Sequence, residues 1–505
     1  MDSRSRTCVQ NGEIVFKVGR FANGTCKDDA IPCLAFFVAQ CSQAPCAIRF
    51  LMPQLRVFCV ALSLCASTAI AQSQVIAPTP PLGWNSWDAY GLTIDEADFR
   101  ANVKVLAGLK QYGWLYAVVD EGWYMQDPFA DKVETRKYVW DANGNLIPAV
   151  GRFPSSANGA GFKPLADSVH KQGLKFGIHI VRGIPKQVVK EDLPIAGTSF
   201  HAQDAADLDA TCPWDEGNYG VSDTPAGQAY YDGMLKLYAS WGLDFIKVDC
   251  ISDHPYRPTE IRQIAEAIRK TGRPIVLSLS PGPTALEHAA EVAKYSQLWR
   301  ITDDHWDEWA PKRNAGSEYP FGLKEEFDRI AKWAPYVKPG NWPDPDMLPE
   351  GSLKPHPGAG EPRQSRYTQD EQRTEFTLWA ISRSPLIFGG NLTQMDDFTR
   401  SLLTNTQVLG VNQTASESHP MTNLPAGLER VRVWVASRAA YTNVPVFCAL
   451  FNLDDQPVTV HFTWDELGFR ARKQSHDLFS GAKVEAWKPV TLTLPAHGSA
   501  IYRVE

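Results

Sequence analysis

Short apolar runs alternate with amphipathic stretches along most of this 505-residue chain, and this rhythm limits the folds that it can adopt. Apolar residues recur at helical spacing over 95–109, 228–241, 260–268 and 370–381. Strands that alternate with helices predict parallel βα units, and eight units are typical of a closed barrel. We therefore expect an α/β fold, a (β/α)8 TIM barrel over residues 80–410. The eight candidate strands are 82–87, 116–120, 174–180, 245–249, 274–280, 298–302, 341–348 and 385–389.

Acidic residues stand at the ends of two of these runs. Side chains alternate between the faces of a strand, so Lys247 and Asp249 share one face, as do Arg300 and Asp304. Asp303 faces the other way, which favours a supporting role. Barrel strands end at one mouth, where we expect Asp249 and Asp304 to converge, and two carboxyl groups in a cleft can cleave a glycosidic bond. The alternative for Lys247 and Asp249 is a buried ion pair without a catalytic role.

The pattern of the sequence changes after residue 410, where no further alternation of strand and helix signals occurs. Short β-rich segments separated by turn signals predict an antiparallel β-sandwich, which we place at residues 411–505. No aromatic stripe marks this region as an independent sugar-binding module, so we interpret it as structural. The candidate strands are 430–437, 444–452, 458–463, 490–494 and 500–504.

The N-terminal region has the features of a leader. Residues 52–71 begin with methionine, contain an apolar core at 57–66 and end in Ala-Ile-Ala at 69–71, a small-residue cleavage site. We predict a signal peptide there and a secreted or periplasmic protein that starts at Gln72. Residues 1–51 fit no part of a signal and are interpreted as a mis-called extension, with a genuine long prepeptide as the alternative.

Charge and cysteine content exclude several classes of protein. A net charge of −7 without a basic patch predicts no binding to nucleic acid or to an anionic membrane after signal cleavage. The mature chain keeps Cys212, Cys250 and Cys448, too few for a disulfide framework. A Cys212–Cys250 bridge and three free thiols are equally compatible with the sequence. Because no CxxC or HExxH pattern occurs, we predict no metal and no cofactor.

At its motifs the chain resembles glycoside hydrolase family 27, the family of α-galactosidases and α-N-acetylgalactosaminidases. The motifs that carry the resemblance occur in the same order as in the family, and they span nearly all of the mature chain. The motifs are TPPLGWNSW (79–87), GRFP (151–154), GLKFGI (173–178), WGLDFIKVD (241–249), WRITDD (299–304), DPDML (344–348), LWA (378–380), ALFN (449–452) and HGS (497–499).

The resemblance implies a retaining hydrolysis in two steps. Asp249 matches the family nucleophile, and Asp304 matches the acid/base. We expect Lys247 to keep Asp249 ionised, and burial beside that charge to raise the pKa of Asp304. Asp346 fits either a sugar contact near the seventh strand or a helix cap.

The resemblance also implies the sugar contacts. Trp87 matches the tryptophan that stacks on the sugar ring. Asp120 and Glu121 match the acidic pair that holds the 4- and 6-hydroxyls of galactose. Lys247 and Arg300 match the groups that bind the 3- and 2-hydroxyls.

Some positions depart from the family pattern. Glu121 stands where aspartate is usual, and its extra methylene extends the carboxylate by about 1.5 Å, which favours a pentopyranose that lacks C6. Ser280 is small and leaves room beside C2 of the sugar. Trp306 and Trp309 are extra aromatics for a leaving-group subsite, and the long third loop, 197–219, is expected to carry specificity.

We therefore expect a secreted, exo-acting α-galactosidase whose partner is a carbohydrate substrate. The alternative is the same machinery with another glycon, either a β-L-arabinopyranoside or a different α-glycoside. A non-catalytic sugar-binding protein is a third reading, which the presence of both Asp249 and Asp304 disfavours because binding alone needs neither role.

Overall fold

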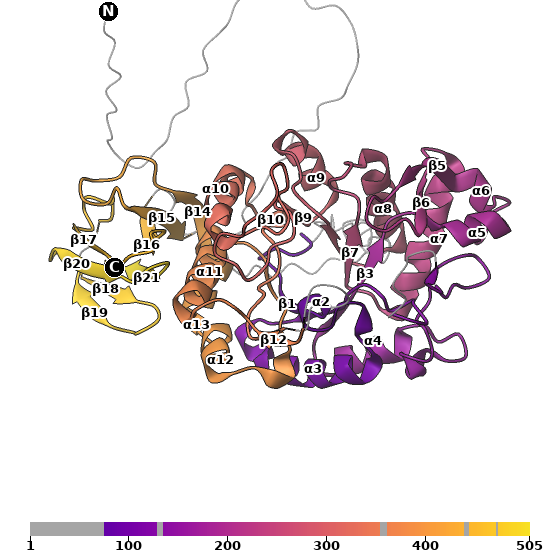
Figure 1. Cartoon of the computed structure of the whole chain (residues 1–505), viewed down its shortest axis with the longest axis horizontal. Coiled ribbons are helices and arrows are strands. Elements are labelled where there is room, and N and C mark those ends of the chain that lie inside the picture. Colours follow the sequence, from indigo (N-terminus) through magenta and orange to yellow (C-terminus); the bar gives the residue numbers. More distant parts are fainter. Residues whose placement is uncertain (1–74, 129–134, 354–360, 439–443, 471–472) are drawn as a thin grey trace, which may run out of the picture. The chain divides into compact units, whose positions relative to one another are not determined.

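Eight parallel strands form the centre of the structure, a computed structural model, and helices surround them (Figure 1). The structure describes residues 75–128, 135–353, 361–438, 444–470 and 473–505. The predicted extension (1–51) and signal peptide (52–71) lie outside these residues. Among the described residues, no helix has the length and apolar character needed to cross a membrane.

The predicted TIM barrel is confirmed, and each candidate strand is present. The spatial order is β10-β9-β8-β7-β3-β2-β1-β13. The circle closes after β10, where Leu348 N donates to Ile387 O at 2.8 Å and Gly389 N donates to Leu348 O at 3.0 Å. The strands are β1 (Leu82–Asn85), β2 (Tyr116–Val119), β3 (Lys175–Val181), β7 (Phe245–Asp249), β8 (Val276–Leu279), β9 (Leu298–Arg300), β10 (Trp342–Asp344) and β13 (Leu386–Phe388).

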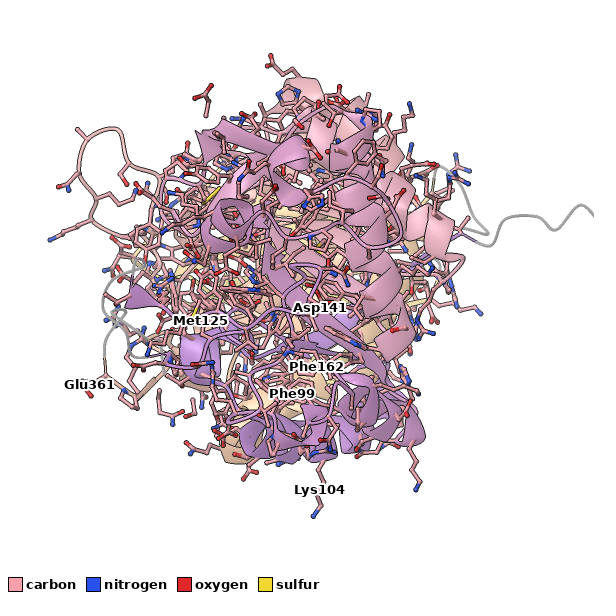
Figure 2. All side chains as sticks on the ribbon, turned by 90° about the vertical axis from the view of Figure 1, so that its right-hand side faces the viewer. Phe99, Lys104, Met125, Asp141, Phe162 and Glu361 are labelled. Atoms are coloured by element: carbon pink, nitrogen blue, oxygen red, sulfur yellow. A yellow bond between two sulfur atoms is a disulfide. The ribbon has the colours of Figure 1, made fainter. Side chains whose placement is uncertain are left out.

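The barrel helices bury one apolar stripe each, as helix α3 (Glu96–Leu109) illustrates. The Asp95 side chain caps its first turn by accepting from Asp98 N at 2.9 Å. Phe99 and Val103 are buried one turn apart, whereas Lys104 projects outward (Figure 2). The other helices of eight or more residues are α4 (Lys163–Lys171), α7 (Pro225–Trp241), α8 (Pro258–Thr271), α10 (Leu323–Trp333), α11 (Gln369–Ser382) and α13 (Thr406–Thr414). Shorter helices are α2 (Trp87–Tyr90), α5 (Lys186–Glu191), α6 (Ala202–Ala205), α9 (Ala289–Tyr295) and α12 (Asp397–Leu403).

The long insertion after β3 folds into a small sheet. Strands β4 (Ile184–Pro185), β6 (Asn218–Val221) and β5 (Ala206–Thr211) pair antiparallel in that order. The segment between β5 and β6 is thereby fixed at both ends, and it carries Trp214 and Asp215.

The C-terminal region is the predicted antiparallel β-sandwich, and its strands begin at Ala415. A six-stranded sheet and a two-stranded antiparallel sheet of β17 and β20 enclose an apolar core that includes Leu450, Val460 and Trp464. Strands β14, β18 and β19 were not predicted, because they are short or polar. The strands of the large sheet are, in spatial order, β14 (Ala415–Pro420), β15 (Val431–Arg438), β16 (Pro445–Asn452), β21 (Ser499–Val504), β18 (Gln474–Asp477) and β19 (Lys483–Glu485). The two-stranded sheet consists of β17 (Val458–Phe462) and β20 (Val490–Leu494).

Gly390 permits the barrel to close, because a Cβ there would lie 2.1 Å from Glu350 O. We expect Gly390→Ala to lower the free energy of unfolding by about 1–3 kcal/mol through overpacking. Gly410→Ala is the matched control, since a Cβ at this α13 position meets nothing within 4 Å. The control should be neutral or stabilising by up to about 1 kcal/mol. Urea unfolding followed by tryptophan fluorescence measures both, and equal midpoints would contradict this account of closure.

Candidate active site

A cavity of about 200 Å³ lies at the C-terminal ends of the barrel strands. Its walls come from segments that follow β1, β2, β7, β8, β9 and β10, and from the insertion after β3. The structure brings all eight residues of the predicted site into this one cavity. They are Trp87, Asp120, Glu121, Lys247, Asp249, Ser280, Arg300 and Asp304.

Asp249 ends β7 and is held as an anion. Its Oδ2 lies 3.4 Å from His179 Nε2, and its Oδ1 accepts from Cys250 N at 2.7 Å. Burial alone would raise the pKa of Asp249, but the hydrogen bond and charge of His179, together with Lys247 and the Cys250 N–H, lower it below its ordinary value. The expectation that Lys247 helps to keep Asp249 ionised is confirmed in direction, and His179 contributes more.

The buried ion pair of Lys247 is with Asp120 rather than with Asp249. Lys247 Nζ lies 3.1 Å from Asp120 Oδ2, because the long side chain reaches across β3 to the end of β2. Asn85 also donates to Asp120 Oδ2, at 2.6 Å, and Glu121 N donates to Asp120 Oδ1 at 2.9 Å. Burial opposes ionisation, yet these contacts and the charge of His179 lower the pKa of Asp120 to about 2. A fixed negative charge therefore lies on the cavity wall.

His179 was not among the predicted site residues, yet it contacts Asp249. It is buried, and although burial alone would lower its pKa, Asp120 and Asp249 raise it above the ordinary value. The sequence did contain a signal, because His179 is the one polar side chain inside the otherwise apolar run Phe176–Val181. In register it lies beside Lys247, so β3 and β7 present a histidine and a lysine side by side.

Glu121 lies in a different environment from Asp120. Burial raises the pKa of Glu121 to about 8, and the nearby Asp215 adds to the rise while His179 and Arg136 oppose it. Arg136 Nη1 lies 3.7 Å from Asp215 Oδ2, and both residues line the cavity. Asp215 belongs to the loop 197–219 that was expected to carry specificity, whereas no motif pointed to Arg136.

A disulfide holds part of this wall. Cys212 and Cys250 are bonded, which settles the alternatives that the sequence left open. The bond ties the segment with Trp214 and Asp215 to the residue that follows Asp249. Trp214 is 44% exposed at the rim of the cavity.

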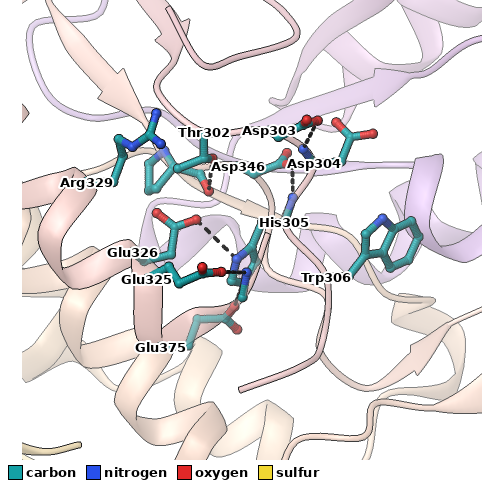
Figure 3. Close-up of polar contacts among 12 residues, drawn as sticks. Thr302, Asp303, Asp304, His305, Trp306, Glu325, Glu326, Arg329, Asp346 and Glu375 are labelled. Atoms are coloured by element: carbon teal, nitrogen blue, oxygen red, sulfur yellow. Dashed lines mark hydrogen bonds and ion pairs between the residues drawn. The ribbon is translucent and has the colours of Figure 1, made fainter. Parts of the chain in front are cut away.

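Asp304 contacts the cavity from the loop after β9. Its Oδ1 lies 3.2 Å from Arg300 Nη2, and Arg300 also contacts Asp346 Oδ2 at 2.6 Å. Although the Asp304 side chain is 43% exposed, partial removal of its carboxyl group from water raises its pKa to about 6; Arg300 opposes this rise, whereas Asp346 and Asp249 add to it. The prediction that burial and the charge of Asp249 raise the pKa of Asp304 is therefore confirmed in direction. Asp303 does not line the cavity and instead accepts from Asp304 N at 2.8 Å (Figure 3).

Asp346 and Trp306 line the cavity, whereas Trp309 lies elsewhere. Asp346 lines the cavity and no helix begins there, so the helix-cap alternative is wrong. Trp306 lines the cavity, but Trp309 does not: its ring stacks on His497 of the sandwich, with ring centres 4.0 Å apart. The expected pair of leaving-group aromatics is thus reduced to Trp306.

Asp88 is an additional acid of the cavity. It is buried, its Oδ2 has no hydrogen-bond partner among the described residues, and burial, followed by the charge of Asp346, raises its pKa well above the ordinary value. The sequence contained one signal for Asp88, its position directly after the first candidate strand, 82–87.

Comparisons with known proteins agree with this arrangement. A family model described as alpha galactosidase A matches residues 205–414, and one described as alpha galactosidase C-terminal beta sandwich domain matches residues 429–504. The crystal structure of a family 27 β-L-arabinopyranosidase from Geobacillus stearothermophilus is 40% identical, with a TM-score of 0.77, and the match covers 85% of this chain and 97% of that chain. The chain belongs to glycoside hydrolase family 27.

Other relatives carry related names. A variant of the same Geobacillus stearothermophilus protein, solved in complex with arabinose, is 41% identical with a TM-score of 0.77, covering 85% of this chain and 97% of that chain. Alpha-galactosidase A of Cellvibrio japonicus is 26% identical over 460 residues, which cover 88% of this chain and 96% of the relative. An alpha-galactosidase of Coffea arabica is 28% identical over 430 residues, 84% of this chain and 93% of the relative. The family 27 protein is accordingly a glycoside hydrolase.

The Cys212–Cys250 bond gives a direct test of the cavity wall. Because it closes a loop of 38 residues, its reduction should lower the free energy of unfolding by about 4 kcal/mol on the chain-entropy model. Under denaturing conditions, iodoacetamide should label peptides with Cys212 and Cys250 only after treatment with dithiothreitol, whereas Cys448 should be labelled without it. Labelling of all three cysteines before reduction would contradict the bond.

Proposed function

We propose that this family 27 enzyme is a retaining exo-glycosidase that releases a terminal pyranose of the galacto ring configuration. The observation that carries the proposal is the opposite environment of two carboxyl groups in one cavity. Asp249 is favoured as an anion, whereas Asp304, with a pKa of about 6, is favoured as the neutral acid below that pH. A pair whose surroundings separate their pKa values in this way suits a nucleophile and a general acid.

In the first step, an Asp249 oxygen attacks the anomeric carbon. The bond from that carbon to the leaving oxygen breaks, and Asp304 gives its proton to that oxygen. In the second step, water attacks the anomeric carbon, Asp304 accepts a proton from the water, and the bond to Asp249 breaks. Two displacements at one carbon retain the anomeric configuration. The 43% exposure of the Asp304 side chain supports its role, since departing alcohol and incoming water both meet it from the open side.

The size of the cavity supports an exo mode of action. About 200 Å³ is less than the roughly 300–1,000 Å³ of pockets that hold drug-sized ligands, and it suits a single sugar ring. In this proposal Trp87 stacks on the ring, and the fixed charges of Asp120, Lys247 and Arg300 bind its hydroxyls. Ser280 leaves room beside C2.

Glu121 favours L-arabinopyranose over galactose as the glycon. L-arabinopyranose has the ring stereochemistry of galactose but no hydroxymethyl group at C5. The extra methylene of Glu121 extends its carboxyl group into the cavity at the position expected to face C6. Similarity to the Geobacillus stearothermophilus β-L-arabinopyranosidase supports the same choice. We therefore propose β-L-arabinopyranosides as the preferred substrates and α-galactosides, the first expectation from the sequence, as the second candidate.

The disulfide supports export of the protein. Disulfides form and persist in oxidising compartments such as the bacterial periplasm and the extracellular medium. Together with the predicted signal peptide, the Cys212–Cys250 bond supports a secreted or periplasmic location.

The pH dependence of hydrolysis follows from the two carboxyl groups. Above a pH of about 6 Asp304 loses the proton that it must donate, so kcat/KM should fall about tenfold per pH unit. The acid limb should lie below pH 3.8, the ordinary value of the Asp249 carboxyl, because the pKa of Asp249 is lowered. Asp304→Asn should remove the upper limb when an activated 2,4-dinitrophenyl glycoside is the substrate. A wild-type rate that stays flat to pH 8 would contradict these roles.

The choice of glycon is tested at Glu121. Wild-type enzyme should have a higher kcat/KM for p-nitrophenyl β-L-arabinopyranoside than for p-nitrophenyl α-D-galactopyranoside. Glu121→Asp should shift this ratio toward galactose by at least about tenfold, the effect of one methylene in a tight pocket. Glu216→Asp, whose side chain is 65% exposed outside the cavity, is the matched control and should leave the ratio unchanged. A ratio that Glu121→Asp does not move would remove Glu121 from glycon selection, and cleavage of neither substrate would refute the proposed glycons.

A further inference from the structure

His305 directly follows Asp304, and its imidazole is enclosed between two helices. Its Nε2 forms a 2.7 Å hydrogen bond with Oε1 of Glu375 on α11, and its Nδ1 lies 3.2 Å from Oε1 of Glu326 on α10. All three side chains are 0% exposed. Figure 3 shows the ring of His305 pointing away from Asp304 and toward the two glutamates. We refer to His305, Glu326 and Glu375 as the histidine clamp.

The main chain on either side of Asp304 is fixed together with this ring. His305 N donates to Asp346 Oδ2 at 3.0 Å, and the same oxygen contacts Arg300 at 2.6 Å. Asp304 O accepts from Phe321 N at 2.7 Å. By contrast, within the described residues the Asp304 carboxyl group has one polar contact, with Arg300. Its orientation therefore depends strongly on the backbone that carries it.

The members of the histidine clamp are favoured in their neutral forms. Burial, followed by the charge of Arg300, lowers the pKa of His305 to about 3, so its ring is neutral, with one N–H and one bare nitrogen. Burial raises the pKa of both Glu326 and Glu375 well above the ordinary value, with Asp346 adding to the first and Glu350 to the second. A neutral imidazole has one N–H, which can lie on Nε2 and donate to Glu375 Oε1 across the 2.7 Å contact, whereas the contact of Nδ1 with Glu326 does not have hydrogen-bond geometry. The groups that face the clamp are Arg300, Asp307, Arg329, Asp344, Asp346, Glu350 and Tyr367.

We propose that His305 is a positioning residue for Asp304, and that Glu326 and Glu375 clamp its ring so that the acid is held toward the leaving oxygen. A displacement of about 1 Å at a reacting group can cost a hundredfold in rate, which makes such a clamp consequential. The inference rests on the proposed acid/base role of Asp304. It adds that the accuracy of proton donation is set by residues on α10 and α11 that lie behind the cavity.

Leaving-group dependence separates positioning from general damage. Aryl glycosides with a poor leaving group, such as p-methoxyphenol, need the proton from Asp304, whereas 2,4-dinitrophenolate leaves without it. We expect Glu326→Met, Glu375→Met and His305→Gln to lower kcat/KM at least about 30-fold on the p-methoxyphenyl glycoside and less than about threefold on the 2,4-dinitrophenyl glycoside of the glycon that wild-type enzyme prefers. Asp328→Asn, on α10 with a side chain 78% exposed, is the matched control and should change neither rate.

Asp304→Asn decides what a negative result means. If Asp304→Asn shows the leaving-group dependence but the clamp variants slow both substrates equally, or slow neither, the positioning inference is wrong and the proposed function stands. If Asp304→Asn shows no such dependence, both the acid role and the inference fail. Should His305→Gln not fold, as judged by circular dichroism, the two glutamate variants decide, because each roughly conserves side-chain size while it removes one polar partner of the ring.

Discussion

The proposed mechanism depends on one electrostatic contrast between two carboxyl groups: Asp249 is stabilised as an anion, whereas Asp304 nearby is stabilised with its proton. Both carboxyl groups lie in the cavity, partly removed from bulk water, which by itself favours the neutral form of each. Asp249 remains ionised because His179, a backbone N–H and Lys247 outweigh burial. Asp304 has Arg300 alone, and Arg300 is shared with Asp346, so burial prevails. The barrel provides this contrast because parallel strands end at a common edge, where loops can place different partners beside each acid.

Support for the cavity extends behind its walls. The carbonyl oxygen of Cys250 accepts from Arg182 Nε at 2.6 Å, and Arg182 forms a buried ion pair with Glu260 at 2.9 Å. The backbone that follows Asp249 is therefore held from behind the cavity, at the carbonyl group of Cys250. The peptide after Asp304 is fixed in a comparable way by Asp346 and by the histidine clamp. Removing one partner of such buried pairs leaves an uncompensated polar group, so these positions tolerate little change.

The sequence predicted the barrel well because strands that are buried on both faces read as apolar runs. All eight residues that it predicted for the site line the cavity, since the end of a strand can be recognised from the local sequence. What it could not predict were pairings across the fold. Lys247 and Asp249 share a face, yet the lysine reaches Asp120. Asp215, from a loop remote in sequence, lies close enough to Glu121 to raise its pKa. Trp309 packs on the sandwich because its partner ring, His497, belongs to the other end of the chain. Strands such as β18 lack any apolar alternation that could announce them.

The most direct measurement of the central claim is to trap the covalent intermediate with an activated 2-deoxy-2-fluoro derivative of the preferred glycon. The account predicts an intact mass increased by one fluoroglycosyl group, and a peptide map that places this group on the carboxyl of Asp249. Turnover in the Asp249→Ala variant, a label on another residue, or release of product with inverted anomeric configuration would contradict it.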